Sequence, residues 1–278
     1  MISINSKIVN ITIGDNYPVR TMGIINLSKE SFYKGSVVTA DNLINTVRLM
    51  EEEGADFLDV GARSTAPGVE PISIKEEEER LLPILKRILD ITHCPISIDT
   101  QYSSVAEKAL TLGAHIINDI SGLKTDSKLV GIISNYDCPV ILMATKKVPG
   151  DCHTIPEIVK ELKISIEIAK NNGINPNNII IDPGIGKWVN SKTYEYNLQI
   201  IKSLESLRTL QKLILVGISR KSFIGDVLNL PDPANRLNGS LAATVIAVYN
   251  GAHLIRTHDV GAQIEMIKMA KALRMSNL

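Results

Sequence analysis

Short apolar runs with the character of β-strands alternate with helix-like stretches along nearly the whole chain of 278 residues. We count eight such strand–helix units, which begin near residues 21, 55, 95, 115, 138, 178, 212 and 252. A Gly-Ala pair precedes a strand at Gly54, Gly113 and Gly251, and this weak internal repeat marks helix-to-strand turns. Eight units in about 250 residues predict an α/β fold, a (β/α)8 TIM barrel in a single domain. A doubly wound open sheet is the alternative that the same alternation allows.

Seven of the strand-like runs end on a polar or ionisable residue. Burying such a group at the end of a strand is costly unless something pairs with it. Ligands of a barrel bind at the C-terminal ends of its strands, so these endings predict a ring of polar groups around one ligand. The endings are Asn26, Asp59, Asp99, Asn118-Asp119, Asp182, Ser219-Arg220-Lys221 and Arg256-Thr257-His258-Asp259.

Helices are expected between the strands, and several carry signals at their ends. Ser73, three residues before Glu76, predicts a capping box, and the acidic run 76–79 is interpreted as a solvated helix start. Gly54, Gly113, Gly173 and Gly251 are expected at helix C-termini. Residues 1–20 precede the first unit and are predicted to cap the bottom of a barrel domain formed by residues 21–278. The expected helices span 42–53, 74–90, 103–112, 126–134, 155–171, 192–207, 234–250 and 261–274.

Composition excludes several classes of function. The formal net charge is +0, which gives no general attraction to nucleic acid or to an anionic membrane. No apolar run is long enough to span a bilayer, and the N-terminus lacks the pattern of a signal peptide. Cys94, Cys138 and Cys152 are widely spaced, which indicates structural thiols in a reducing cytoplasm rather than a disulfide framework or a zinc site.

The strand-end acids Asp59, Asp99 and Asp182 have three interpretations: metal ligands, acceptors for a bound ligand, or caps of the strand ends. No His or Cys motif of a transition-metal site accompanies them. A heteroaromatic ring with several N–H donors is an equally suitable partner, because carboxylates, an Asn and a Lys can bind its edge.

Basic and hydroxyl side chains gather in the last two units, in 219–222 and at Arg256 and His258. The loops after strands seven and eight of a barrel often bind phosphate, so these residues predict an anion site. The glycine-bearing segment 182–187 lacks the spacing of a Walker loop and is predicted to be a tight turn. No nucleophile elbow and no Ser/His/Asp or Cys/His arrangement stands out.

From about residue 22 to residue 273, the chain resembles the dihydropteroate synthases, a family of pterin-binding (β/α)8-barrel enzymes. Together the matching segments are highly specific, although several would be weak alone. They are 23–26 with Ser31-Phe32, 61–68, 98–100, 115–120, 182–184, 217–225, Arg236 with 239–242, and 251–260.

The resemblance implies a transferase of folate biosynthesis that condenses 6-hydroxymethyl-7,8-dihydropterin pyrophosphate with 4-aminobenzoate or a related arylamine and releases pyrophosphate. It also implies a homodimer and Mg2+ as cofactor, with Asn26 as a metal ligand. Asp99, Lys221 and Arg256 are the catalytic candidates. The implied contacts are Asp99, Asn118, Asp182 and Lys221 with the pterin; Asn26, Arg256 and His258 with the pyrophosphate; and Ser64, Thr65 and Arg220 with the arylamine. Asp59 has no implied role beyond orienting the second loop.

Two loops and the arylamine wall depart from the family's pattern. The departures place new cations near the second substrate and remove an arginine and two aromatic residues. They are Lys34, Arg63, Ala66, Lys146, Ile185 and Lys187. One interpretation is neutral drift, with Arg63 replacing the arginine lost at Ala66. The other is an arylamine that carries a phosphate, as in the methanopterin pathway, since added cations suit it.

Two further functions share the pterin-binding barrel. One is pterin-dependent methyl transfer to a corrinoid protein, which needs no pyrophosphate site, so the basic residues of the last two units argue against it. The other is a non-catalytic pterin-binding paralogue, which the changed loops leave open.

Overall fold

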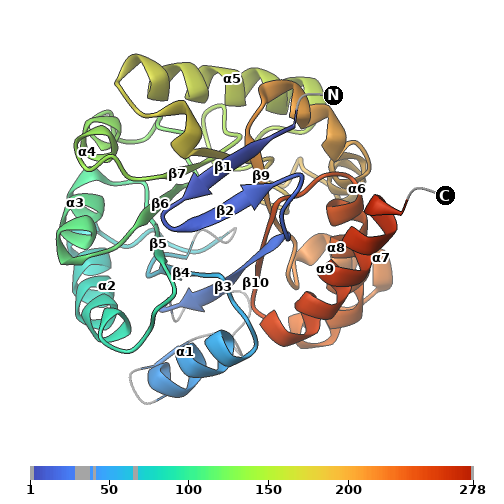
Figure 1. Cartoon of the computed structure of the whole chain (residues 1–278), viewed down its shortest axis with the longest axis horizontal. Coiled ribbons are helices and arrows are strands. Elements are labelled where there is room, and N and C mark those ends of the chain that lie inside the picture. Colours follow the sequence, from blue (N-terminus) through green and yellow to red (C-terminus); the bar gives the residue numbers. More distant parts are fainter. Residues whose placement is uncertain (1–2, 29–37, 40–41, 65–67, 277–278) are drawn as a thin grey trace.

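The computed structural model of the chain is a closed barrel of eight parallel strands, which confirms the predicted (β/α)8 fold (Figure 1). It describes residues 3–28, 38–39, 42–64 and 68–276. The strands follow one another around the barrel in chain order, and the last pairs with the first. They are β3 (Arg20–Asn26), β4 (Phe57–Gly61), β5 (Ile96–Asp99), β6 (Ile116–Asp119), β7 (Val140–Met143), β8 (Ile179–Asp182), β9 (Leu213–Gly217) and β10 (Leu254–Thr257).

Helices form a ring around the barrel (Figure 1). Within the described residues they are α1 (Leu43–Glu52), α2 (Ile74–Leu89), α3 (Ser103–Leu112), α4 (Leu129–Asn135), α5 (Ile155–Asn171), α6 (Tyr194–Lys202), α7 (Ser222–Leu228), α8 (Leu237–Tyr249) and α9 (Val260–Met275), with 3-10 turns η2 (Pro176–Asn178), η3 (Leu204–Leu210) and η4 (Pro233–Arg236). The sequence prediction missed α7, because its seven residues are too few to show an apolar period. It also merged α6 and η3, which are two elements.

The helix-end signals are mostly confirmed. Ser73 Oγ accepts a hydrogen bond from Glu76 N at 3.1 Å, which is one half of the predicted capping box. The Glu76 carboxylate instead binds Arg80 at 2.7 Å. Gly113 ends α3 in the left-handed region, with φ of 114°. The acidic run is not wholly solvated as predicted, because Glu77 is fully buried.

Inward-facing side chains divide the barrel interior into an apolar half and a polar half. The apolar half lies where the strands begin and contains Met22, Phe57, Ile116, Ile141, Ile180, Leu213, Leu215 and Leu254. A hairpin of β1 (Asn5–Ile8) and β2 (Ile11–Gly14) packs Ile8 and Ile13 against this cluster and lies across the barrel opening (Figure 1). Water is therefore excluded from that end. The division of the chain at residue 20 into two regions stays a prediction.

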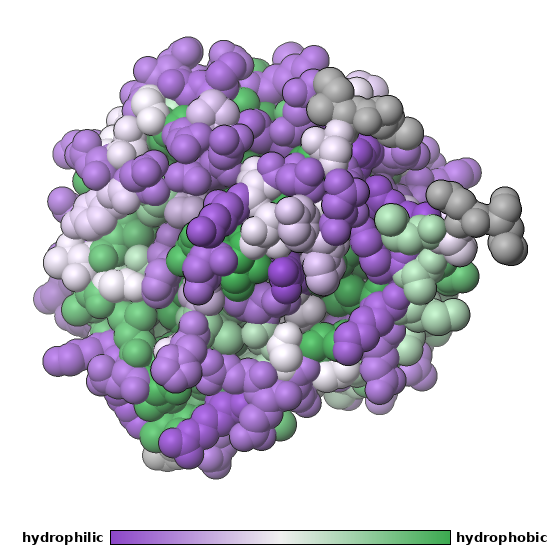
Figure 2. All heavy atoms as spheres, in the orientation of Figure 1, coloured by the Kyte–Doolittle hydropathy of each residue, from purple (hydrophilic) through white to green (hydrophobic). Residues whose placement is uncertain are grey.

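The surface around the hairpin is largely hydrophilic, with hydrophobic atoms visible in the gaps (Figure 2). Across the residues that the structure describes, no helix has the length and apolar character needed to cross a membrane. All three cysteines are free. Burial raises the pKa of Cys94 and of Cys138 to about 12, so both thiols are protonated at neutral pH.

The Gly-Ala repeat seen in the sequence has a structural cause in the residue that follows each pair. The side chain of that residue accepts a hydrogen bond from a backbone N–H near the start of the preceding strand. Asp56 Oδ2 accepts from Thr21 N at 2.8 Å. His115 Nδ1 accepts from Ile96 N at 3.1 Å, and His253 Nδ1 accepts from Ile214 N at 3.0 Å. The repeat therefore joins consecutive strands at the start of the barrel.

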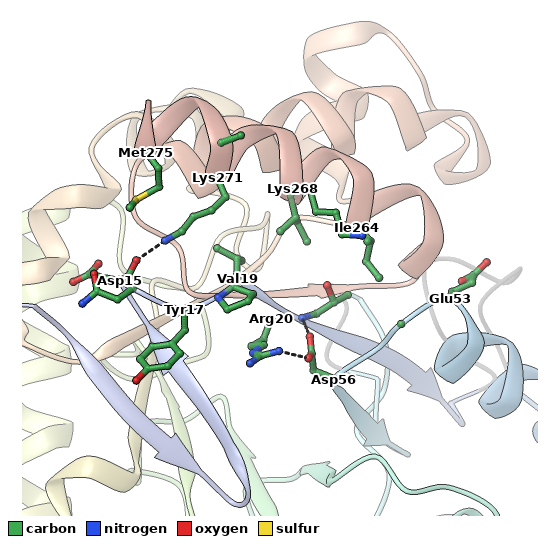
Figure 3. A pocket seen from close by; sticks show the side chains of 16 residues that line it. Asp15, Tyr17, Val19, Arg20, Glu53, Asp56, Ile264, Lys268, Lys271 and Met275 are labelled. Atoms are coloured by element: carbon green, nitrogen blue, oxygen red, sulfur yellow. Dashed lines mark hydrogen bonds and ion pairs between the residues drawn. The ribbon is translucent and has the colours of Figure 1, made fainter. Parts of the chain in front are cut away.

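Asp15 connects the hairpin to the last helix and to η3. Its carboxylate accepts hydrogen bonds from both terminal nitrogens of Arg208, at 2.7 and 2.8 Å, and Lys271 Nζ donates to its backbone oxygen (Figure 3). Nearby, Arg20 pairs with Asp56 at 2.9 Å. Asp15, Arg20, Asp56 and Lys271 line a cavity of about 660 Å3 between the hairpin exit and α9.

Replacing His115 with Phe removes the acceptor of Ile96 N–H and should lower the free energy of unfolding by about 1–3 kcal/mol, the cost of an unsatisfied buried donor. Burial lowers the pKa of His115 and of His253 below the usual 6.5. The unfolded chain therefore binds more protons, and this stabilisation is present above pH 6.5 and is lost as the pH falls toward the folded pKa.

Urea denaturation followed by circular dichroism at pH 7.5 and pH 5.5 measures both effects. His93→Phe is the matched control, because His93 is exposed. Wild-type stability of His115→Phe at pH 7.5 would contradict the role of this side chain as a strand acceptor.

Candidate active site

Strand register brings the predicted polar endings together at one mouth of the barrel. Asn26 pairs with Gly61, Gly61 with Asp99, and Asp99 with Asn118, which makes a continuous row across four strands. Gly61 creates space within this row, since a Cβ at this position would lie 3.3 Å from Asp99 Cβ. Asp182 ends β8 beside Met143 of β7. The ring that the sequence predicted is therefore formed by inward-facing side chains at the ends of neighbouring strands.

Arg256 is the central cation of this mouth. Its Nε donates to Asp59 Oδ2 at 2.5 Å, and its Nη2 donates to Asp99 Oδ2 at 3.0 Å. Asn118 Nδ2 donates to the same Asp59 oxygen at 3.1 Å. Burial raises the pKa of Asp99 to about 7, although the Arg256 charge opposes the shift. The negative charges of Asp59, Glu77 and Asp119 raise it further.

Lys221 follows β9, the neighbour of β10 in the barrel, and lies beside the loop that follows β8. Its Nζ donates to Ile185 O at 2.5 Å and lies 5.2 Å from the centre of the Trp188 ring. Burial lowers the pKa of Lys221 to about 8, and the charge of Asp182 opposes the shift. Burial also raises the pKa of Asp182, which Lys221 opposes. The two groups therefore stabilise one another's charged forms.

The loop after β8 is a tight turn, as predicted. Gly184 and Gly186 adopt positive φ values of 71° and 139°. Gly184 N donates to Asp182 Oδ1 at 2.7 Å, and the fully buried Lys192 donates to Gly184 O at 2.7 Å. The backbone at Ile185 is thereby held against Lys221.

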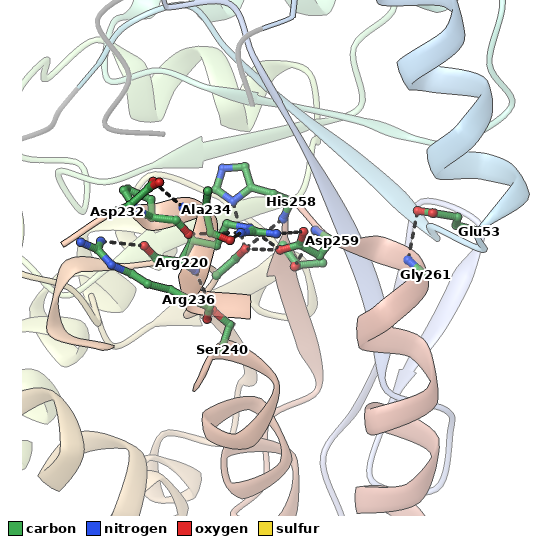
Figure 4. A network of polar contacts seen from close by, with 12 residues as sticks. Glu53, Arg220, Asp232, Ala234, Arg236, Ser240, His258, Asp259 and Gly261 are labelled. Atoms are coloured by element: carbon green, nitrogen blue, oxygen red, sulfur yellow. Dashed lines mark hydrogen bonds and ion pairs between the residues drawn. The ribbon is translucent and has the colours of Figure 1, made fainter. Parts of the chain in front are cut away.

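Arg220 does not contribute a free cation to the mouth. Its guanidinium binds Asp259 through Nε at 2.9 Å and Nη2 at 2.7 Å, and Nη1 donates to the carbonyl oxygens of η4 (Figure 4). Its backbone N donates to Ser240 Oγ at 2.8 Å. Arg236 in turn donates to Arg220 O at 3.1 Å. Arg220 therefore anchors the turn that carries Lys221.

His258 is a neutral group at this site. Its Nδ1 lies 2.9 Å from Ser219 Oγ. Burial, reinforced by the charges of Arg256, Arg220 and Lys221, lowers the pKa of His258 to about 3. His258 therefore adds no positive charge near neutral pH and offers hydrogen bonds instead, and its contact with the pyrophosphate stays a prediction.

The new cations of the altered loops are engaged by acids of neighbouring helices. Arg63 Nε binds Glu77 at 2.7 Å, and Lys146 Nζ binds Glu157 at 2.8 Å. Lys187 lies 3.5 Å from Asp226. These pairs give the cations a structural role, so they do not favour an arylamine that carries a phosphate. Ser64 is half-buried, whereas Thr65, Ala66 and Lys34 lie outside the described residues.

Sequence reasoning missed two residues of this region. Glu77 is fully buried and also accepts a hydrogen bond from Thr100 Oγ1 at 2.6 Å, but its place in an acidic run concealed it. Trp188 is the only tryptophan of the chain, and that rarity was the available signal. The alternative of a metal site made by the acids has no support, since in the described part of the chain no three His, Cys, Asp or Glu side chains group suitably.

The chain is similar in sequence to known proteins over most of its length. Residues 22–258 match the family model described as pterin binding enzyme. A dihydropteroate synthase of Clostridium beijerinckii is 41% identical over 250 residues, which cover 89% of this chain and 91% of that protein. A dihydropteroate synthase of Synechocystis sp. is 36% identical over 260 residues, covering 91% and 89% of the two chains.

Solved structures of similar fold carry the same name. The dihydropteroate synthase of Xanthomonas albilineans with 4-aminobenzoic acid has a TM-score of 0.87 and 31% identity, covering 99% of this chain and 100% of that one. The enzyme of Coxiella burnetii in complex with pteroic acid has a TM-score of 0.85 and 37% identity, with the same coverage. With this identity over nearly its whole length and a mouth of buried acids, amide and cations, the chain belongs to the dihydropteroate synthase family of pterin-binding enzymes.

Proposed function

We propose that this protein condenses 6-hydroxymethyl-7,8-dihydropterin pyrophosphate with 4-aminobenzoate to give dihydropteroate and pyrophosphate, in folate biosynthesis. The observation that carries the proposal is the row of Asn26, Asp99 and Asn118 that meets Arg256 and Lys221 at one mouth. Acids and an amide suit the N–H groups of a pterin, and the cations suit a pyrophosphate. The relatives crystallised with pteroic acid and 4-aminobenzoic acid support the same substrates.

The pterin ring is assigned to Asp99, Asn118, Asp182 and Lys221. Ionised carboxylates only accept hydrogen bonds, an ammonium only donates, and an amide does both, so together they match a ring edge that mixes donors and acceptors. The apolar half of the barrel closes the site from below. This exclusion of water strengthens each polar contact with the ring.

The pyrophosphate is assigned to Asn26, Arg256 and neutral His258. In the reaction, the bond between the pterin methylene carbon and the pyrophosphate oxygen breaks, and pyrophosphate leaves with the electron pair. The arylamine nitrogen bonds to the carbon and loses a proton. Arg256 stabilises the charge of the leaving group, and the pocket aligns the two substrates. No protein nucleophile is required.

Mg2+ is the proposed cofactor, and Asn26 is its proposed ligand. Asn26 Oδ1 accepts one hydrogen bond, from Ser28 N at 3.0 Å, and a carbonyl oxygen has a second lone pair. Mg2+ in enzymes is usually held by one or two protein oxygens together with substrate phosphates and water, so a single amide oxygen fits. When bound, the ion would neutralise charge on the leaving pyrophosphate.

The arylamine is assigned to the side of the mouth formed by the second loop and the β9–α7 turn. Ser64 and Thr65 belong to the former, and Arg220 acts on the latter by anchoring Lys221 rather than by touching the amine. Methyl transfer to a corrinoid protein and a non-catalytic role are not favoured, because the relatives from Clostridium beijerinckii and Synechocystis sp. are both dihydropteroate synthases.

A second copy of the chain is the proposed partner, and the cytoplasm is the proposed location. An apolar groove of about 330 Å3 runs across α6, α7 and α8, and its rim exposes 42% of Leu198, 42% of Val227 and 48% of Ile246. Exposed apolar patches of this kind mark association surfaces. Free thiols suit a reducing compartment.

Replacing Asp99 with Asn keeps the shape of the side chain but removes its charge. Affinity for the pterin substrate should fall about 10- to 100-fold, as expected for a hydrogen bond to a charged group. Isothermal titration calorimetry measures the change. Asp90→Asn is the matched control, because Asp90 is exposed at the end of α2. Unchanged affinity in Asp99→Asn would remove Asp99 from the pterin site.

The pH profile of kcat/KM for the pterin substrate should be bell-shaped. Activity should rise as Asp99 ionises near pH 7 and fall as Lys221 loses its proton near pH 8. His258, with a pKa of about 3, should contribute no limb. Steady-state assays from pH 5.5 to 9.5 on the wild type and His258→Gln test this. Loss of a limb in His258→Gln would show that His258 titrates in this range.

Removing Mg2+ should affect the pyrophosphate and leave the pterin ring bound. With EDTA present, calorimetry should show much weaker binding of the pterin pyrophosphate and unchanged binding of the pterin alcohol. Pyrophosphate release should require the ion and both substrates. Equal affinity for pterin pyrophosphate with and without EDTA would rule out the metal role of Asn26.

A further inference from the structure

Of the three strand-end acids Asp59, Asp99 and Asp182, Asp59 is the one that no substrate role explains. It is fully buried inside the barrel, where an unpaired charge would be very costly. Its Oδ2 accepts two hydrogen bonds, from Arg256 Nε at 2.5 Å and from Asn118 Nδ2 at 3.1 Å. These donors belong to β10 and β6, which are not neighbours of β4 in the barrel. Asp59 therefore links strands across the interior.

Asp59 lies deeper in the barrel than Asp99. Its strand partner is Ser97, whereas Asp99 pairs with Gly61, one inward-facing position nearer the mouth. The exposure of the side chains agrees, at 0% for Asp59 and 25% for Asp99. Asp99 is therefore placed to contact a ligand directly. Asp59 is placed to contact Arg256 and Asn118, which in turn contact the ligand.

The effect of Asp59 on Arg256 follows from the shape of a guanidinium. An arginine side chain has several freely rotating bonds, and one hydrogen bond leaves much of that freedom. Carboxylates at Nε and at Nη2 hold two nitrogens of the planar group and fix its orientation. Within the described residues Nη1 has no protein partner, so this nitrogen is available to an anion at the mouth.

The effect on Asn118 follows from the chemistry of an amide. A carboxylate only accepts hydrogen bonds, so the amide must turn its Nδ2 toward Asp59. Asn118 Oδ1 and the second N–H are then left for other partners. Asp59 therefore fixes the orientation of the Asn118 amide, and with it the atoms of Asn118 that can bind a ring edge.

We propose that Asp59 is a positioning residue that orients Arg256 for the leaving pyrophosphate and Asn118 for the pterin, and so couples the two halves of the substrate site. This inference rests on the proposed function. It differs from the assignments above in that Asp59 acts through two other side chains and touches neither substrate.

Two substitutions separate the two effects. Asp59→Asn keeps an oxygen that can accept from Asn118 but removes the charge that holds Arg256. We expect kcat to fall about 100-fold, the scale of a small misplacement of a catalytic group. Affinity for the pterin alcohol, which has no pyrophosphate, should stay within about threefold of wild type, since this oxygen keeps the contact with Asn118. Asp59→Leu keeps neither the contact with Arg256 nor the contact with Asn118. It should lower both kcat and the affinity for the pterin alcohol.

A double-mutant cycle tests whether Asp59 acts through Arg256. If it does, Asp59→Asn combined with Arg256→Met should be no slower than Arg256→Met alone, within about twofold. Ser97→Ala is the matched control, because Ser97 is the buried strand partner of Asp59 and binds no substrate in the assignments above. Its kinetics should equal those of the wild type. Circular dichroism verifies that each variant is folded, and Asp59→Asn alone carries the test if Asp59→Leu does not fold.

Two results would overturn the proposal. One is a loss of kcat in the double variant that equals the product of the losses in Asp59→Asn and in Arg256→Met. The other is an equal loss of kcat and of pterin-alcohol affinity in Asp59→Asn, which a general loss of structure would produce. Failure of the proposed function looks different, because the wild type itself would then release no pyrophosphate from the two substrates, while the binding measurements would still report on Asp59.

Discussion

The interaction on which the site depends is the ion pair between Arg256 and the two acids Asp59 and Asp99. A barrel interior is a poor place for three charges, and each is tolerated only because the others are present. Arg256 Nε and Nη2 satisfy one oxygen of each acid. Removing one partner would leave a buried charge uncompensated. The same contacts that make the mouth stable therefore also hold its functional groups in place.

The hairpin at the other end makes this arrangement possible. β1 and β2 pack isoleucines onto the apolar half of the barrel and exclude water from below. Polar groups above this layer meet a low-dielectric environment on one side and the open mouth on the other. Burial accordingly raises the pKa of Asp99 to about 7 and lowers the pKa of Lys221 to about 8. Burial is the largest cause of both shifts, and the charges of neighbouring side chains modify each of them.

The departures from the family's pattern acquire meaning only through partners in other units. Arg63 is held by Glu77 of α2, and Lys146 by Glu157 of α5. The surroundings of Arg63 also include the Tyr102 ring, 4.9 Å from its guanidinium carbon. The acids beside Arg63 and Lys146 account for these cations without a phosphate on the second substrate. The altered loops are therefore consistent with a change in how the loops are anchored, with the pterin site unaltered.

The sequence by itself determined the eight strand–helix units, the positions of the strands and their polar endings, because these depend on local periodicity and on where each apolar run ends. It favoured a barrel over a doubly wound sheet, and the tertiary structure decided that the sheet closes. It also indicated the helix-terminal glycines, since a left-handed residue is a local requirement. Only the tertiary structure decided that Asp59 serves Arg256, that His258 is neutral, and that Arg220 faces Asp259. The contact between Asp59 and Arg256 depends on barrel closure, which brings residues 197 positions apart in sequence within hydrogen-bond distance. The other two outcomes depend on burial and on packing between the last two units. The local sequence pattern does not predict which strands will face each other across the interior of a closed barrel.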